Sequence, residues 1–151
     1  VKPGAPGVGE VLRVPIRERY RVLVAVIKRQ LDTPSMLRVY GRKINIYGRE
    51  ALKKLLENPT LINFLELSRE FSIKVGMFDR ELQRKLEFLN KAQSRGEILG
   101  FYLKKNALVI VGQGELGFLE EILKERLGWV TFKCEILNEG LRVKVVKDGS
   151  A

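Results

Sequence analysis

Three glycines that follow an apolar run have the spacing of a dinucleotide-binding turn. Gly112, Gly114 and Gly117 form the pattern G-x-G-x-x-G between a strand-like segment and a leucine-rich helical segment. In such a turn, backbone N–H groups approach a pyrophosphate at the start of a helix, and a carboxylate after the next strand binds a ribose hydroxyl. Glu135 stands 18 residues after Gly117 and has the right type for that role.

The segment that follows favours a different interpretation of this turn. Residues 129–136 alternate, with Val130, Phe132, Cys134 and Ile136 on one face, whereas a strand inside a parallel sheet is apolar on both faces. Residues 138–140 then join this strand to another alternating run, 141–146, as in a hairpin. We therefore predict a glycine-rich turn between a strand and a helix, with no bound cofactor.

The chain contains no histidine and a single cysteine, which restricts its chemistry. Histidine is the commonest general base and metal ligand, so the usual nucleophile triads and zinc sites are excluded. Cys134 cannot form an internal disulfide, and its strand position predicts a core side chain. We expect no catalytic residues and no metal, although catalysis by carboxylates, lysine or a bound metal stays open as an alternative.

The charge of the chain is strongly positive and uneven. The formal net charge is +10, and residues 1–75 hold 15 Lys and Arg against 7 Asp and Glu, compared with 13 against 11 in residues 76–151. A field concentrated in one half favours a polyanionic partner, with nucleic acid first and an acidic protein second. The abundant Lys, Arg and Glu also resemble thermophile composition.

Composition also predicts where the protein works. Apolar residues make up 45% of the chain, and no apolar run approaches the 18 residues of a membrane span. The first residues lack the hydrophobic region of a signal peptide. We expect a cytoplasmic protein with no membrane partner. If the protein is an adaptor, we expect it to self-associate or to bind an acidic protein.

The predicted elements define an α+β fold made of two similar halves, each with the order helix, β-hairpin, helix, strand, packed with antiparallel sheet. We expect a flexible tail at 1–10, a basic first half at 11–77, a second half at 78–147 and a C-terminal tail at 148–151. In the first half the expected elements are a helix at 17–31, a hairpin of 37–40 and 44–47, helices at 49–57 and 59–70, and a strand at 71–77. In the second half they are a helix at 80–95, strands at 98–104 and 107–111, a helix to 127, and strands at 129–136 and 141–146.

Two of these assignments depend on a comparison of the two halves. The β-branched run 22–27 also suits a buried strand, and a helix is favoured there because of the register between the halves. In that register Ile44, Ile46 and Gly48 align with Leu108, Ile110 and Gly112, which indicates an internal duplication.

The order α-β-β-α-β-β over residues 80–147 resembles one half of the LAGLIDADG homing endonucleases. The resemblance is of element order, since the helices end in Gln93-Ser-Arg-Gly-Glu97 and Lys28-Arg-Gln-Leu-Asp32 and lack the namesake motif. It implies a metal-dependent DNA endonuclease as an alternative, with Asp32 and Glu97 as the acidic candidates.

The predicted first hairpin supplies the main candidate binding surface. If its aliphatic residues face the core, its tyrosines and cations share the outer face, where rings could stack on bases and cations could meet phosphates. Two further basic clusters precede residue 22 and line the helix at 80–95. The predicted nucleic-acid-binding residues are Arg17, Arg19, Arg21, Arg38, Tyr40, Arg42, Lys43, Asn45, Tyr47, Arg80, Arg84, Tyr102, Lys104 and Lys105. The leading hypothesis is a non-catalytic protein that binds DNA or RNA.

Overall fold

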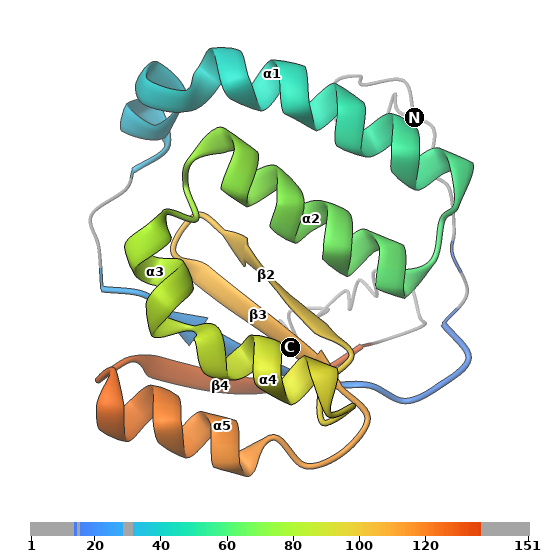
Figure 1. Ribbon diagram of the computed structural model, residues 1–151, viewed down its shortest axis with the longest axis vertical. Helices are drawn as coiled ribbons and strands as arrows, with labels where there is room; N and C mark the ends of the chain where they lie inside the picture. The colour runs from blue at the N-terminus through green and yellow to red at the C-terminus, as the bar shows by residue number, and fades with distance from the viewer. Residues whose placement is uncertain (1–13, 15, 29–31, 137–151) are drawn as a thin grey trace, which may run out of the picture.

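The computed structural model describes residues 14, 16–28 and 32–136 (Figure 1). It is an α+β structure, with a four-stranded antiparallel sheet and several helices. The strands are β1 (Arg21–Val26), β2 (Gly100–Lys104), β3 (Ala107–Gly112) and β4 (Val130–Glu135). The helices are α1 (Thr33–Glu57), α2 (Leu61–Val75), α3 (Arg80–Lys85), α4 (Glu87–Ser94), α5 (Gly117–Glu121) and a π-helical turn, η1 (Ile122–Arg126). Within these residues, no helix is both long and apolar enough to span a membrane.

Strand β1 occupies the interior of the sheet, whose order is β2-β3-β1-β4. It pairs antiparallel with β3 on one side and β4 on the other, so that Leu23 stands opposite Ile110 and Lys133. The prediction of a helix over 17–31 is therefore wrong in this region. The valine-rich run is a strand because β-branched residues pack well on a pleated surface and both edges find a partner strand.

Helix α1 replaces the hairpin predicted at 37–47. Its start is well defined, because Asp32 accepts a hydrogen bond from the backbone N–H of Ser35 (2.8 Å) and Pro34 occupies the first turn. Apolar and aromatic side chains recur at helical spacing as Met36, Tyr40 and Ile44. These residues pack toward α2. The segment therefore follows the 3.6-residue period of a helix and not the two-residue alternation of a strand.

The strand predicted at 71–77 is likewise wrong. Helix α2 continues through Val75 and ends at Gly76, whose φ of 97° is the left-handed conformation that suits a glycine cap. Since the first half contains β1 and two long helices, the internal duplication is not confirmed. The sheet combines β1 from the first half with three strands from the second.

The structure of the second half agrees more closely with the elements predicted from the sequence. Asp79 caps α3 by accepting from the N–H of Leu82 (2.8 Å), and Gly96, with φ 74°, follows the end of α4. The predicted single helix is divided into α3 and α4 at Leu86. Strands β2 and β3 form the expected hairpin, with Lys105 at φ 53° in its turn. The predicted strand 141–146 and both tails lie outside the described residues.

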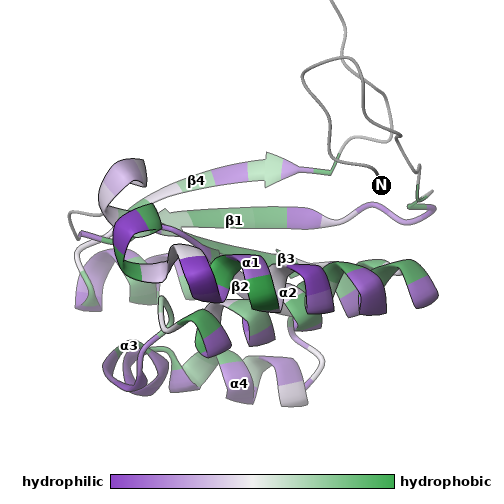
Figure 2. Ribbon diagram, turned by 90° about the horizontal axis from the view of Figure 1, so that it is seen from above, coloured by the Kyte–Doolittle hydropathy of each residue, from purple (hydrophilic) through white to green (hydrophobic). Residues whose placement is uncertain are grey.

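The helices of the described residues gather on one face of the sheet (Figure 2). The main core lies between the sheet and helices α3, α4 and α5, around Leu23, Phe101, Ile110 and Leu123. The prediction that the apolar residues of β4 face the core is wrong. Val130 and Phe132 are 56% and 54% exposed, and Cys134 is exposed as well. The opposite side of this edge strand is the one that faces α5 and η1, where Thr131 contacts Glu120.

Candidate functional site

In the glycine turn between β3 and α5, close packing requires a glycine at position 112. A Cβ added to Gly112 would lie 2.9 Å from Leu116 Cδ2 and 3.4 Å from the carbonyl oxygen of Glu97. Gly114 and Gly117 have open space around them, and none of the three has a left-handed φ. Leu116 is buried, so Gly112 allows the core to close beneath the turn.

The charges around this turn do not suit a pyrophosphate. Glu115 forms an ion pair with Arg21, and Gln113 donates a hydrogen bond to Glu18. Glu135 lies on β4 opposite Arg21, in an antiparallel strand that pairs with β1 and not with β3. A dinucleotide crevice forms at the carboxyl ends of parallel strands, whereas the four strands in the described part of the chain all pair antiparallel. The geometry therefore supports the strand-to-helix turn.

A groove between α1, α2 and β2 is lined in part by the predicted site residues Tyr102, Lys104 and Lys105. Its volume is about 490 Å³, within the range of ligand sites in proteins. Apolar side chains from all three elements line it, and Lys104 and Lys105 contribute its cationic side chains. Lys105 donates a hydrogen bond to Thr33 Oγ1 (2.5 Å), which ties the β2–β3 turn to the start of α1.

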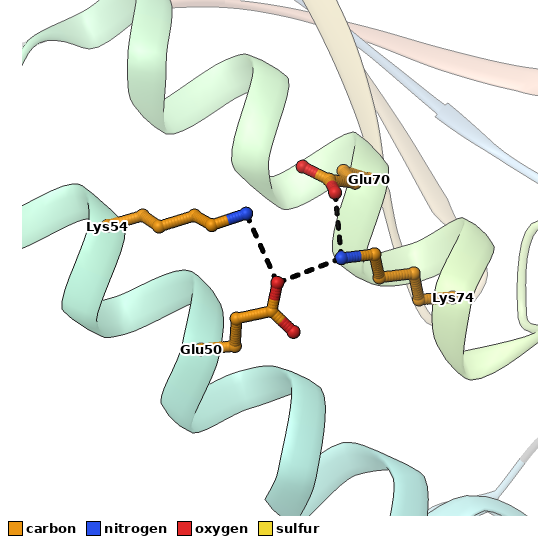
Figure 3. A network of polar contacts seen from close by, with 4 residues as sticks. All are labelled: Glu50, Lys54, Glu70 and Lys74. Carbon is orange, nitrogen blue, oxygen red and sulfur yellow. Dashed lines mark hydrogen bonds and ion pairs between the residues drawn. The ribbon is translucent and has the colours of Figure 1, made fainter.

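A network of polar contacts holds α1 against α2 (Figure 3). Lys74 Nζ lies 3.0 Å from Glu50 Oε1 and 2.8 Å from Glu70 Oε1, while Lys54 Nζ lies 3.1 Å from the same Glu50 oxygen. The hydrogen bond from Lys74 lowers the pKa of Glu50 below its ordinary value. These side chains are partly exposed, so each pair stabilises the fold little, and their main effect is to align the two helices.

Glu120 on α5 has the most strongly shifted acid group. Hydrogen bonds from Lys124, then Lys133 and Thr131, lower its pKa to about 2. Lys124 Nζ lies 2.6 Å from Glu120 Oε1, and Lys133 Nζ lies 2.7 Å from Glu120 Oε2. The contacts to residues 131 and 133 join α5 to the edge strand β4, which indicates a structural role.

The structure does not bring the predicted binding residues onto one sheet face. Because residues 37–47 are helical, the proposed platform of tyrosines and cations does not exist there. Tyr40 and Tyr47 are half-buried and pack beside Phe71 and Val75. The other predicted residues of this segment, Arg38, Arg42, Lys43 and Asn45, are exposed on α1.

The remaining predicted residues are spread over four other parts of the chain. Arg17 and Arg19 are exposed ahead of β1, and Arg21 begins it. Arg80 and Arg84 are exposed on α3. Tyr102 is half-buried on β2, where its ring contacts Phe64 edge-on at 5.5 Å, and Lys104 and Lys105 stand at the β2–β3 turn.

Sequence reasoning missed the residues of α1 and α2 that line the groove. Ile44, Ala51 and Leu55 of α1 face Phe64 and Phe71 of α2 across it. The spacing of Ile44, Ala51 and Leu55 by seven and four residues was the available signal, since it places all three on one helix face. Among the described residues, no group of three or more acids or cysteines could hold a metal ion.

Comparison with solved structures finds a protein with a similar fold. A structure titled "Phosphotransferase related to CoA biosynthesis pathway" superposes with a TM-score of 0.71 at 25% sequence identity, covering 92% of this chain and 44% of that chain. No family model matches the sequence.

Two curated relatives are pantoate kinases. The protein from Methanocaldococcus jannaschii is 30% identical over 82 residues, which are 53% of this chain and 29% of that kinase. The protein from Thermococcus kodakarensis is 32% identical over 91 residues, 60% of this chain and 30% of that kinase. The matched region thus spans less than a third of the curated relatives.

These similarities show that the predicted function is wrong. A non-catalytic nucleic-acid-binding protein, with nucleic acid as its partner, does not agree with relatives named as kinases and a phosphotransferase. The endonuclease and adaptor alternatives are set aside for the same reason. Positive charge indicates an anionic ligand without distinguishing a polymer from a small molecule, and that ambiguity is the source of the error.

Proposed function

We propose that this chain forms part of a small-molecule kinase that phosphorylates a hydroxy acid of the pantoate type. The observation that carries the proposal is the superposition of nearly the whole chain on a phosphotransferase at a TM-score of 0.71. The two pantoate kinases support it independently through sequence. Because the chain matches only part of each relative, both the activity and the substrate belong to the proposal.

The charge of the chain suits such a reaction. In a kinase reaction the acceptor hydroxyl oxygen bonds to the γ-phosphorus of ATP, the bond to the bridging oxygen breaks, and ADP leaves while the hydroxyl loses its proton. Both ATP and a hydroxy acid are anions, so a net charge of +10 attracts either substrate. The predicted cytoplasmic location is part of the same proposal, because ATP is an intracellular substrate.

The experiment that tests this proposal combines turnover with binding. ADP release is measured with ATP, Mg²⁺ and pantoate, and ³¹P NMR identifies the phosphorylated acid; reactions without acceptor, or with a hydroxy acid of different carbon skeleton, are the controls. We expect ADP release that depends on pantoate, and an increase of melting temperature with pantoate or ATP. The absence of both turnover and stabilisation at millimolar concentrations would overturn the proposal.

A further inference from the structure

The groove between α1, α2 and β2 has walls suited to an aliphatic chain. Its apolar lining comes from Met36, Ile44, Leu52 and Leu55 of α1 and from Phe64, Leu67 and Phe71 of α2. Leu103 and half-buried Tyr102 add the β2 side. At about 490 Å³, the groove has the volume of roughly sixteen water molecules, taking about 30 Å³ for each. Such a space, lined mainly by hydrocarbon, favours an apolar occupant over water.

The charged side chains of the groove all have the same sign. Lys104 and Lys105 follow each other at the β2–β3 turn, and none of the described side chains that line the groove is acidic. Lys105 is oriented by its hydrogen bond to Thr33 Oγ1, whereas Lys104 is exposed and makes no ion pair with any described residue. The acids of the neighbouring helix pair, Glu50 and Glu70, are bound to Lys74 instead.

Helix α1 forms the outer wall of the groove. Helix α1 lies alongside α2, and α2 lies alongside the edge strand β2 (Figure 1). Contacts between described residues join this outer wall to the remaining elements, among them the polar network around Lys74, the cluster of Met36 with Val75, and the bond from Lys105 to Thr33. A ligand between α1 and β2 would therefore contact both walls without entering the main core.

We propose that this groove binds a medium-chain aliphatic carboxylate, with its chain between α1, α2 and β2 and its carboxylate at Lys104 and Lys105. The apolar walls recognise the chain through burial of methylene groups. The two lysines recognise the head through charge-assisted hydrogen bonds. This inference does not depend on the proposed kinase function.

Calorimetric titration with hexanoate, octanoate and decanoate tests the apolar part. Each added methylene should tighten binding by about fourfold, which is the ratio equivalent to about 0.8 kcal/mol per buried CH₂. Ala51→Phe adds a ring to the α1 wall and should weaken decanoate binding at least tenfold. Ser68→Leu fills the groove from α2 and provides a second test if the first variant unfolds; thermal unfolding of both variants establishes that they fold.

Charge variants test the head group. Lys104→Met should weaken decanoate binding by about two- to fivefold, as expected for one partly exposed charge pair. The matched control is Lys53→Met, which removes an exposed lysine of α1 that does not line the groove and should leave binding unchanged. Decanol, which has the chain without the charge, should bind more weakly than decanoate.

The same titrations contain the results that would overturn the inference. Binding that does not depend on chain length, or that survives both Ala51→Phe and Ser68→Leu, would place the ligand elsewhere. Tighter binding of decyl phosphate than of decanoate would identify a phosphate head and reject the carboxylate. If pantoate bound more tightly than decanoate and lost affinity in the filled variants, the groove would be an acceptor site and not a site for an aliphatic chain.

Discussion

Replacing Gly112 with alanine should destabilise the fold because of one steric contact. The new Cβ would lie 2.9 Å from Leu116 Cδ2, with the Glu97 carbonyl oxygen at 3.4 Å and Ile98 Cα at 3.6 Å. Two of these three neighbours are backbone atoms, so Leu116, which is buried, must move. Overpacking of this kind costs about 1 to 3 kcal/mol. For a chain of this length, that corresponds to a decrease in melting temperature of about 2 to 12 °C.

Urea denaturation followed by tryptophan fluorescence measures this effect. The chain has one tryptophan, Trp129, which is buried and reports on the core directly. Gly114→Ala is the matched control, because a Cβ there meets nothing within 4 Å and the φ of Gly114 is not left-handed. The control should be as stable as the original protein or gain up to about 1 kcal/mol from reduced freedom of the unfolded chain.

A double substitution identifies the contact responsible. Leu116→Ala alone removes buried volume and should cost about 2 to 5 kcal/mol. In its presence the additional cost of Gly112→Ala should largely disappear, since the clashing atom is gone. If Gly112→Ala proved as stable as the original protein while Gly114→Ala was destabilised, the assignment of Gly112 to packing would be refuted.

Three further substitutions examine the contacts between elements. Ser72→Ala removes a buried hydroxyl that donates to the Leu103 carbonyl at 2.6 Å, so it should cost about 1 to 3 kcal/mol in urea denaturation; Ser94→Ala, at an exposed site, should change stability by less than about 0.5 kcal/mol. Asp79→Ala removes the N-cap of α3 and should cost about 1 kcal/mol, and a variant as stable as the original would contradict the capping role. The pKa of Glu120 falls from 4.5 to about 2 on folding, so its contribution to stability is complete above the unfolded value and is lost as the pH falls toward 2. Glu120→Gln should thus be less stable than the original protein at pH 7, with a difference that shrinks between pH 4.5 and pH 2; an unchanged difference across that range would contradict the pKa.

The charge and composition of the chain reduced the number of possible functions without identifying one. A net charge of +10 with no histidine indicates an anionic ligand and removes the common histidine-based sites. Both statements hold equally for a nucleic acid and for the anionic substrates of a kinase. The similar proteins and the fold distinguish between these two kinds of ligand. Net charge cannot do so, because it attracts any anion and carries no information on the shape of the ligand.

The sequence by itself determined the elements whose stabilising contacts lie within one short segment. The helix after Asp79 could be predicted because its cap and its leucines at helical spacing lie within one short segment, and the β2–β3 hairpin because its turn separates two alternating runs by few residues. The glycine turn lies between β3 and α5, as the apolar run before it and the leucine-rich run after it predicted.

Some segments have patterns that fit both a helix and a strand, and only the tertiary structure decided which of the two they form. Residues 37–47 alternate as a strand would, yet they also carry apolar side chains three or four residues apart, and the presence of α2 as a packing partner selects the helix. The run 22–26 fits either structure by itself, and it becomes a strand because β3 and β4 are both available to bond its edges. The face of β4 that turns inward depends on α5, which contacts Thr131 and leaves Phe132 exposed. In each case the deciding partner is another element of the chain, and the local pattern of the segment contains no record of how that element packs.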